Sequence, residues 1–470
     1  MYEIQKKSRT IFENIAVVSD TLNLPVYVVG GYVRDIILER QGFDIDFVVV
    51  GDALEFCRQF KKRFRASKLV TYPKFGTCMM QYKDHKLEFV TAREESYHEN
   101  SRKPDVKQAD LYSDLSRRDF TINTLAMNIQ PADFGSLIDP FDGLKDIGNG
   151  LIRTPLDPDR TFSDDPLRMM RAVRFAAQLS FTIDPSTLQA IHDTADRLRI
   201  ISQERITAEF NKIMMSPKPS VGLNLLESSG LLERFFPEFS QTRGIEQRSQ
   251  HHHKDVFYHT LQVIDQVAKS SDKLPLRLAA LFHDIGKPTT KRYNDKSGWT
   301  FHGHEVVGDR MSASILHRMK YSREIISYVQ KLVRLHLRPM ALVSEEVTDS
   351  AIRRLLFLSG KEFDDLMILC RADITSKNPV KVKRYLQNYE ILLQKSEEVE
   401  AKDRVRAFKS PVDGNEIMQI FQLEAGPKIG EIKKRIEDAI LSGEIPNEHD
   451  AALTFLLALK EKDLDLFRSS

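Results

Sequence analysis

The chain has 470 residues, of which 41% are hydrophobic and 29% charged, and its formal net charge is +2. This length exceeds what one hydrophobic core usually fills, so we expect two to four domains. The composition is typical of a soluble globular protein, and no apolar run approaches the about 18 residues of a membrane span. The N-terminus lacks the apolar core and cleavage site of a secretion signal, which predicts a cytoplasmic protein.

The cysteines and the basic residues give weaker indications. Cys57, Cys78 and Cys370 are far apart and show no paired spacing, which fits a reducing compartment and argues against a disulfide or a zinc finger. A net charge near zero does not by itself indicate nucleic-acid binding, since a phosphate-binding surface needs local positive charge. Lys and Arg do crowd the stretch 58–68, and a solvated helix face is the simpler interpretation of that stretch.

The pattern of apolar residues changes along the chain. Between Pro25 and Val50, β-rich runs alternate with a glycine pair and an apolar-periodic segment, which predicts strand, turn, helix and strand. Further β-like runs cover 76–82 and 86–90, whereas 96–110 has few apolar anchors and is expected to be a flexible loop. After Arg160, helical periodicity dominates. The sequence therefore predicts a mixed α and β first part followed by helices.

A glycine pair and two aspartates form the first candidate site. Gly30 and Gly31 follow a predicted strand and open a helix, where free N–H groups can meet a phosphate. Asp44 and Asp46 lie at i and i+2 of a strand-like segment and so share a face. Such carboxylates suit Mg²⁺, and two ions about 3.5–4 Å apart can activate a hydroxyl and stabilise leaving pyrophosphate. Glu88 is either a third metal ligand or an ordinary edge-strand glutamate.

Five motifs resemble, in order, those of class II tRNA nucleotidyltransferases, the CCA-adding enzymes, whose head is related to the DNA polymerase β nucleotidyltransferase fold. They are GGYVRD at 30–35, DIDF at 44–47, RRDFTINTLAMNI at 117–129, LIDPFDGLKDIGNGLIR at 137–153 and RTFSDDPLRMMRAVRFAAQLSF at 160–181. The resemblance covers about residues 20 to 240. It implies an α+β fold, with a head of this kind followed by an all-α neck, body, HD domain and tail.

The resemblance implies roles for individual residues. Asp44 and Asp46 would be catalytic and bind Mg²⁺, with Glu88 as a further ligand. The residues that would contact the nucleotide are Gly30, Gly31, Arg34, Arg117, Arg118, Asp119, Asp164, Asp165, Arg168, Arg171 and Arg174.

Physical chemistry is consistent with these roles. An arginine fork donates paired hydrogen bonds to phosphate, and a neighbouring aspartate can accept one from a ribose 2′-hydroxyl. Asp165 and Arg168, three apart on a predicted helix, would present an acceptor and donors to a base edge and so select C or A without a nucleic-acid template. Asp164 stands where the family has glutamate, which shortens its reach by one methylene.

A second candidate site lies in the helical half. His259 lies on an apolar-periodic helix, and the adjacent pair His283–Asp284 ends another, a ligand set that suits a divalent metal. These residues, with Asp373, resemble the H…HD…D pattern of HD metal-dependent phosphohydrolases. Two more histidines are candidate ligands for a second metal: His304 and His336. The alternative is an HD helix bundle that serves only as a tRNA-binding scaffold.

These observations predict four domains: a nucleotidyltransferase head (1–155), a helical neck and body for nucleotide selection and RNA binding (156–248), an HD domain (249–376) and a helical tail (377–470). The expected reaction adds CCA to the 3′ end of tRNA from CTP and ATP by two-metal transfer, with tRNA, CTP and ATP as partners and no obligate protein partner. The alternatives are a poly(A) polymerase, an A- or CC-adding enzyme, an HD phosphohydrolase with an RNA-binding N-terminal half, and a noncatalytic RNA-binding protein, against which the intact DxD argues.

Overall fold

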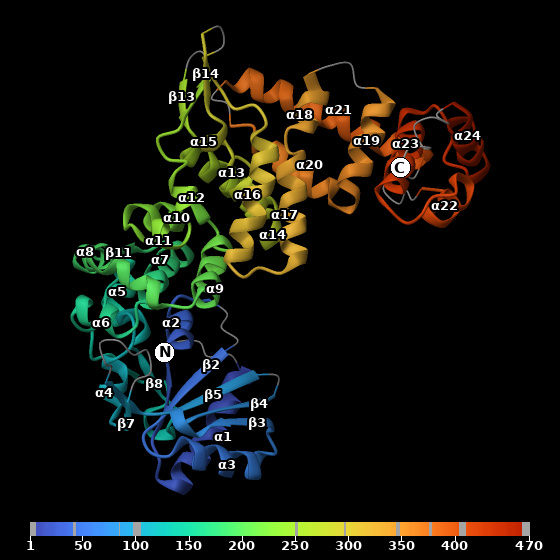
Figure 1. Cartoon of the computed structure of the whole chain (residues 1–470). Coiled ribbons are helices and arrows are strands. Elements are labelled where there is room, and N and C mark those ends of the chain that lie inside the picture. Colours follow the sequence, from blue (N-terminus) through green and yellow to red (C-terminus); the bar gives the residue numbers. More distant parts are fainter. Residues whose placement is uncertain are drawn as a thin grey trace. The chain divides into compact units, whose positions relative to one another are not determined.

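The computed structural model describes residues 6–40, 44–83, 85–96, 105–249, 252–295, 298–344, 348–375, 378–403 and 410–462. It divides into two compact units, Met1–Ser240 and Gln241–Ser470 (Figure 1). The two sites predicted from the sequence fall in different units, so each site is built by one unit alone.

The first unit starts with a seven-stranded sheet of order β3-β4-β5-β2-β1-β8-β9. Only β2 and β5 run parallel; the other neighbouring pairs are antiparallel. The elements that build the sheet and its cover are α1 (Lys6–Leu22), β1 (Val26–Val29), α2 (Gly31–Ile37), β2 (Asp44–Val49), α3 (Ala53–Phe64), β3 (Ser67–Tyr72), β4 (Thr77–Tyr82), β5 (His85–Thr91), β8 (Ala126–Asn128) and β9 (Leu137–Ile138).

Alternation along β2 decides which face of the sheet carries the chemistry. Phe47 is fully buried and stacks on Phe89 of β5 at 4.7 Å between ring centroids. Phe12 of α1 and Phe56 of α3 pack on these two rings, so α1 and α3 cover this face (Figure 1). Because side chains alternate along a strand, Asp46 points to the opposite face, on which Val48 is buried in a separate cluster with Leu115.

Two expectations for the first unit change with the structure. Cys57 of α3 and Cys78 of β4 are joined by a disulfide, with Cα atoms 6.8 Å apart, so the expectation of no disulfide was wrong. The packing of α3 on β4 brings together two cysteines whose spacing gives no hint of pairing. The expectation of a loop over all of 96–110 was wrong for its last part, since β7 (Asp105–Gln108) pairs there with β6 (Arg93–Ser96); 97–104 lie outside the described residues.

The rest of the first unit is mainly helical. Helix α7 is its centre, because ten of its thirteen residues are buried and α9 and α10 both pack against it. The remaining elements are α4 (Leu111–Ser116), α5 (Gly143–Asn149), β10 (Leu151–Ile152), α6 (Pro158–Asp164), α7 (Leu167–Leu179), β11 (Thr182–Ile183), α8 (Pro185–Thr194), α9 (Gln203–Met214), α10 (Pro219–Ser228), α11 (Leu231–Phe235) and α12 (Pro237–Ser240).

The second unit opens with one hairpin, continues as helices and carries a second hairpin between α15 and α16. The two hairpins are β12–β13 and β14–β15. The elements are β12 (Glu246–Ser249), β13 (His252–Asp255), α13 (Val256–Ser270), α14 (Leu274–Phe282), α15 (Lys287–Thr290), β14 (Arg292–Asn294), β15 (Gly298–Thr300), α16 (His304–Arg318), α17 (Arg323–Leu335), α18 (Arg338–Ser344), α19 (Asp349–Ser359), α20 (Phe363–Ala372), α21 (Pro379–Asp403), α22 (Gly414–Phe421), α23 (Pro427–Ser442) and α24 (His449–Lys462).

The end of the chain forms a small core of its own. Val412 joins buried residues of α22, α23 and α24, among them Ile417, Ile436 and Leu456, in one hydrophobic cluster. Within the residues that the structure describes, no helix combines the length and the apolar character needed to cross a membrane.

Candidate active site and metal centre

A glycine turn lies beside the carboxylates of β2. Gly30 has φ +73°, and Val29 before it pairs with Asp46 in the sheet. A Cβ atom at position 30 would lie 3.0 Å from Nη1 of Arg118 and 4.0 Å from Oδ2 of Asp46. Only glycine therefore fits here without strain, and the turn brings a bare backbone between a guanidinium and a carboxylate.

Three carboxylates gather on the face of the sheet opposite to α1 and α3. Asp46 is the register partner of Glu88 on the parallel strand β5, and Asp44 lies two residues before Asp46 on β2. Burial raises the pKa of Asp46; Arg118 opposes this rise and Asp44 reinforces it. Burial, and then the charge of Asp46, raise the pKa of Glu88. This crowding of negative charge favours a bound cation.

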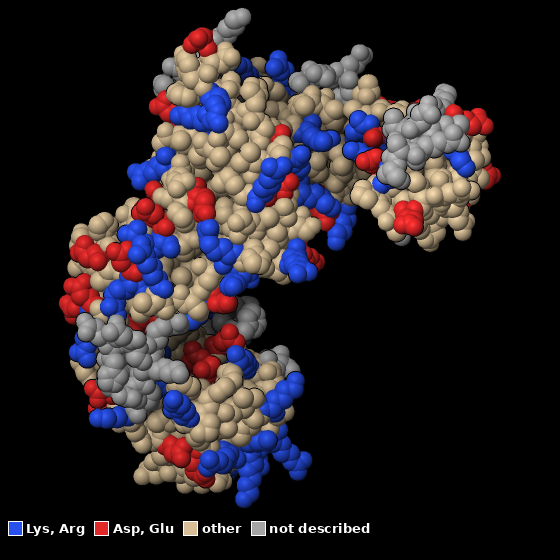
Figure 2. All heavy atoms as spheres, viewed as in Figure 1, with Lys and Arg blue, Asp and Glu red and all other residues tan. Residues whose placement is uncertain are grey.

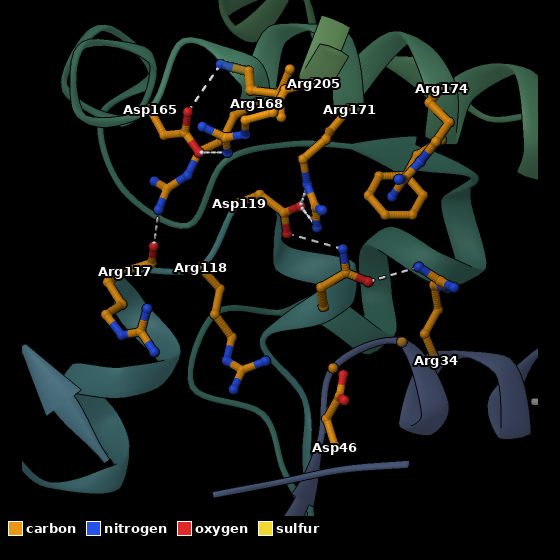
Figure 3. Close-up of a pocket in the computed structure, with 15 residues that line it drawn as sticks. Arg34, Asp46, Arg117, Arg118, Asp119, Asp165, Arg168, Arg171, Arg174 and Arg205 are labelled. Carbon is orange, nitrogen blue, oxygen red and sulfur yellow. Dashed lines mark hydrogen bonds and ion pairs between the residues drawn. The ribbon is translucent and has the colours of Figure 1, made fainter. Parts of the chain in front are cut away.

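A cleft of about 390 Å³ opens beside these carboxylates (Figure 3). In Figure 3 Asp46 points into it from the sheet, while the arginines of α7 reach down from the opposite side. Seven arginines and three aspartates take part, so the cleft carries an excess of positive charge that suits a triphosphate. The lining residues are Gly30, Gly31, Arg34, Asp46, Arg117, Arg118, Asp119, Asn123, Asp165, Leu167, Arg168, Arg171, Arg174, Phe175 and Arg205.

One hydrogen-bonded chain crosses the floor of the cleft. Oδ1 of Asn123 accepts from Nη1 of Arg34 at 2.8 Å, and its Nδ2 donates to Oδ1 of Asp119 at 3.0 Å. Oδ2 of Asp119 accepts from Nε of Arg171 at 2.7 Å. Burial acts to raise the pKa of Asp119, but Arg171 and Asn123 together hold it well below its usual range. The chain locks α2 to α7 through a carboxylate that stays ionised.

A second set of ion pairs fixes the remaining arginines. Asp114 of α4 is completely buried and binds Nη2 of Arg117 at 2.6 Å and Nη2 of Arg118 at 3.0 Å. On the other side, Arg174 pairs with Glu209 of α9 at 2.7 Å, and both are buried. Because their carboxylate partners are fixed, these guanidinium groups are held in place before any ligand arrives.

The expectation that Asp165 and Arg168 share one helix was wrong. Asp165 is extended, with φ −140° and ψ 98°, and α7 begins only after Pro166. The reason is Pro166, which disfavours the helical conformation of the residue before it. Asp165 accepts from the backbone N of Leu167 at 3.2 Å and pairs with Arg205 at 3.2 Å.

The cleft nevertheless collects most of the residues that the sequence singled out. Arg168 and Asp165 both line it, and Arg168 donates to the carbonyl oxygen of Arg117 at 2.6 Å. Asp164 ends α6 and is not among the lining residues. Two lining residues were not predicted from the sequence. Asn123 lies inside the motif at 117–129, whereas Arg205 lies in no recognised motif.

In the second unit, six side chains come together from five helices. His259 and His283 face each other at 3.4 Å between Nε2 atoms, and Asp373 lies 2.9 Å from Nε2 of His259. The three form one group whose ligand atoms all lie within 4.8 Å of one another. The second group of this kind consists of Asp284, His304 and His336.

Asp284 connects the two groups. Its Oδ2 lies 3.2 Å from Nε2 of His283, and its Oδ1 lies 3.3 Å from Nε2 of His304. Nε2 of His304 is in turn 3.3 Å from Nε2 of His336. A carboxylate with one oxygen toward each group is the arrangement of a ligand that bridges two metal ions. Among the described residues, groups of three ligand atoms this close occur only in the second unit.

The outer nitrogen of each imidazole already has a partner. Nδ1 of His283 lies 2.8 Å from the carbonyl oxygen of Ala280, and Nδ1 of His336 lies 2.6 Å from that of Val333. His304 makes the same contact with the carbonyl oxygen of Phe301 at 2.8 Å. A carbonyl oxygen accepts a hydrogen bond only from N–H, so Nδ1 is the protonated nitrogen that these contacts orient. Nε2 of each ring therefore faces the cluster, where it can bind a metal once it has no proton.

The charges in this cluster are strongly coupled. Burial acts to lower the pKa of His283, but Asp284 and Asp373 raise it to about 10. Burial and the neighbouring His283 lower the pKa of His336 to about 4. The pKa of one histidine in the cluster is thus raised and that of another is lowered. Divalent ions can replace protons in such an environment.

Comparisons with known proteins find similarity in both units. Three family models match: the poly A polymerase head domain over 26–153, a probable RNA and SrmB-binding site of polymerase A over 180–242, and the HD domain over 256–376.

Two curated relatives match almost end to end, and a third matches over about three quarters of this chain. A CC-adding tRNA nucleotidyltransferase of Thermus thermophilus is 30% identical over 92% of this chain and 93% of the relative. A CCA-adding enzyme of Pediococcus pentosaceus is 30% identical over 93% and 94%. An A-adding tRNA nucleotidyltransferase of Deinococcus radiodurans is 31% identical over 73% and 78%.

Among solved structures, the Bacillus stearothermophilus CCA-adding enzyme in complex with CTP has a TM-score of 0.69, with 23% identity over 98% of this chain and 100% of that one. This likeness confirms the predicted fold, a mixed head followed by helical regions. With two relatives that match almost end to end at 30% identity, the chain belongs to the family of CCA-adding tRNA nucleotidyltransferases and is a tRNA nucleotidyltransferase with an HD domain.

Proposed function

We propose that this chain adds the complete CCA sequence to the 3′ end of tRNA from CTP and ATP, releasing pyrophosphate. The observation that carries the proposal is the single cleft in which the glycine turn, the carboxylate Asp46 and seven arginines converge. Asp44 and Asp46, with Glu88 beside them, would hold Mg²⁺ together with the phosphates of the nucleotide. Mg²⁺ at this place supplies charge neutralisation and an acidified 3′-hydroxyl. We place this reaction in the cytoplasm, where tRNA and triphosphates are present.

The residues of the chain would position the triphosphate. Arginines 117, 118, 171 and 174 are oriented by buried carboxylates or by aromatic contacts, so their donors need not reorganise when the phosphates arrive. Asp119 would face the ribose, where an ionised carboxylate can accept from the 2′-hydroxyl. Phosphoryl transfer depends mainly on such positioning and on charge stabilisation.

Asp165 and Arg168 would select the base. Cytosine and adenine each present an amino group, which donates, next to a ring nitrogen, which accepts. Asp165 offers an acceptor and Arg168 a donor at the same end of the cleft. Uracil and guanine carry a carbonyl next to an N–H, so the same pair would oppose them. This pattern supports the use of both CTP and ATP by one site.

Relatives that add only A or only CC make product analysis the decisive test. The protein is incubated with a tRNA that lacks its terminal CCA, and with CTP, ATP or both. We expect two added residues with CTP alone, none with ATP alone and three with both. A product that stops at CC, addition of A only to a tRNA ending in CC, or long A tails would instead assign the CC-adding, A-adding or poly(A) activity.

We further propose that the HD cluster hydrolyses phosphoesters with divalent ions that its six ligand residues, Asp284 among them, would hold. The inward Nε2 atoms and the two adjoining ligand groups support this second function. A divalent ion in such a site lowers the pKa of bound water and makes it a nucleophile at neutral pH. Lys287, whose Nζ lies 2.7 Å from Asp284, would offer a positive charge to the phosphate.

Hydrolysis of p-nitrophenyl phosphate in the presence of Mn²⁺, Co²⁺, Ni²⁺ or Mg²⁺ tests this second function. We expect activity in the intact protein and its loss in Asp284→Asn, while Asp46→Asn remains active as the matched control from the other site. Bound metal without any hydrolysis would support the alternative in which the HD bundle is only a scaffold.

A further inference from the structure

The hairpin β14–β15 carries a pair of aromatic side chains with little cover. Tyr293 and Trp299 are register partners across the two strands, and their ring centroids are 5.1 Å apart. Tyr293 is 57% exposed. A cross-strand aromatic pair stabilises a hairpin, but a large ring left this open is more typical of a contact surface.

Cationic side chains border the aromatic pair. Nζ of Lys291 lies 4.3 Å from the centroid of the Trp299 ring. Arg292 is exposed, and its Nη1 donates to the carbonyl oxygen of Lys291 at 2.8 Å, so a second positive charge lies at the start of the hairpin. Figure 2 shows Lys and Arg gathered at the end of the second unit that carries the hairpins in Figure 1.

The aromatic and basic residues continue toward the HD cluster. Phe301 follows Trp299 by two residues, and Nζ of Lys287 lies 5.8 Å from the Phe301 ring. The same Nζ is 2.7 Å from Oδ2 of Asp284. Phe301, two residues after the paired Trp299, is thus linked through Lys287 to the carboxylate between the two ligand groups.

The chain topology places the hairpin at the edge of the cluster. It is inserted between Asp284 and His304: α15 separates Asp284 from β14, and His304 follows β15 by four residues. The hairpin β12–β13 packs against β15 and ends at Asp255, four residues before His259. Two of the six cluster residues, His259 and His304, thus follow these hairpins closely in the chain.

We propose that this hairpin binds single-stranded RNA. A base would stack on the Tyr293–Trp299 pair, and the flanking phosphates would meet Lys291 and Arg292. Rings bordered by cations match nucleic acid, because every base has a stacking face and every linkage a negative charge. The strand would then be directed past Phe301 and Lys287 toward the HD cluster. The proposal goes beyond phosphoester hydrolysis and does not require it.

The single tryptophan of the chain makes the test local, because intrinsic fluorescence reports on Trp299 alone. Full-length protein in EDTA is titrated with a single-stranded oligoribonucleotide of about eight residues. We expect saturable quenching of the Trp299 emission that weakens as salt concentration rises. A base-free ribose-phosphate oligomer of equal length should produce no quenching. Equal quenching by polyglutamate would overturn the proposal in favour of an acidic protein partner.

Variants of the hairpin sharpen the test. Tyr293→Ala should raise the Kd from the fluorescence titration about tenfold, the loss expected for one stacked base. Tyr293→Phe, which keeps the ring, should bind as the unchanged protein does. Tyr258→Ala on α13 is the matched control, since Tyr258 is also exposed, at 46%. Lys291→Gln should reduce the salt dependence.

Two further outcomes would overturn the proposal. One is an unchanged Trp299 emission at RNA concentrations that saturate the anisotropy of a labelled oligomer. The other is an equal Kd for Tyr293→Ala and Tyr258→Ala. Hydrolysis of p-nitrophenyl phosphate in the same variants should be unaffected, because this small substrate needs no stacking. Failure of hydrolysis in every variant would therefore count against the HD function and leave the RNA result standing.

Discussion

The two candidate metal sites of this chain are built in opposite ways. In the HD cluster, six ligand residues are assembled and close together, and the outer nitrogens of the histidines are committed to backbone or hydroxyl oxygens. In the head, three carboxylates line one face of a sheet, Asp44 is exposed, and the facing surface is rich in arginine. One site is complete without substrate, whereas the other lacks ligands that a triphosphate can provide.

This difference teaches what each site requires of its ligand. A cluster of preformed imidazoles would bind a metal ion without help from substrate and release it slowly. Mg²⁺ is more often held by one or two carboxylates together with substrate phosphates, which is the arrangement that the head offers. We therefore expect the head to gain and lose its ion with each nucleotide, and the HD cluster to hold its ions through many turnovers.

The largest expected effect separates the two sites. Asp46→Asn should reduce nucleotide addition to tRNA by on the order of 10³-fold or more, because it removes a charge that must neutralise the ion at the transferring phosphate. Hydrolysis at the HD cluster should stay unchanged. Primer-extension rates and p-nitrophenyl phosphate rates on one preparation check both. Retained addition would show that Asp46 is not a metal ligand.

The same variant has a second consequence. In the metal-free protein the pKa of Asp46 is raised, so at neutral pH the folded state carries a carboxylate that it disfavours. Asn at this position removes that unfavourable charge. We expect the Tm of metal-free Asp46→Asn to rise by roughly 1–3 °C in differential scanning calorimetry. A clear fall in Tm would mean that Asp46 stabilises the fold through its interaction with Arg118.

The next effect concerns metal retention. Asp284→Asn should lower the affinity of the HD cluster for divalent ions by on the order of 100-fold, since it removes the carboxylate shared by both groups. Elemental analysis after gel filtration should find metal in the unchanged protein and much less in the variant. Nucleotide addition should remain within about twofold of normal. A parallel loss of addition would show that the two units are coupled.

The contrast between the sites also explains how far the sequence could predict them. The HD residues are few and chemically distinctive, and His259, His283, Asp284 and Asp373 do come together in space. In the head the motifs correctly indicated the cleft, but not the contacts that shape it. Asp165 lies outside α7 because Pro166 follows it. Arg205, which pairs with Asp165, lies on α9, a helix without a recognisable motif.

Other features could not be predicted because they depend on tertiary packing alone. The Cys57–Cys78 disulfide arises where α3 lies on β4, and the separation of 21 positions in the sequence gives no sign of it. Asp114 is completely buried with two arginines, yet in the sequence it is an ordinary acidic residue before the RRD motif. Periodicity predicts elements, but it does not show which charged side chains will pair across them.

A smaller effect tests this orientation of the arginines. Asp114→Asn keeps the shape of the side chain but removes the charge that holds Arg117 and Arg118, so kcat/KM for CTP should fall about 10- to 100-fold. The loss should lie mainly in KM if the arginines bind phosphate in the ground state. Asp193→Asn is the matched control, because Asp193 is exposed and pairs only with the neighbouring His192 and Gln189 among the contacts described.

The smallest expected effect is a separation of activity from stability in acid. The pKa values of Asp46 and Glu88 are raised. On acidification both carboxylates therefore take up protons at a higher pH than ordinary carboxylates, and a bound metal ion would be released. Asp119 behaves in the opposite way. Its folded pKa is depressed, so its contribution to stability is present above its unfolded pKa of about 3.9 and is lost only as pH falls through the lower, folded value.

Nucleotide addition should therefore decline severalfold between about pH 7 and 5, while circular dichroism shows the fold intact until below about pH 4. Excess Mg²⁺ should shift the activity curve to lower pH, because metal and protons compete for the same oxygens. Activity and structure lost together on acidification would mean that the head carboxylates titrate as ordinary surface groups. In that case the open arrangement of the head would have to be explained by the arginines rather than by a missing cation.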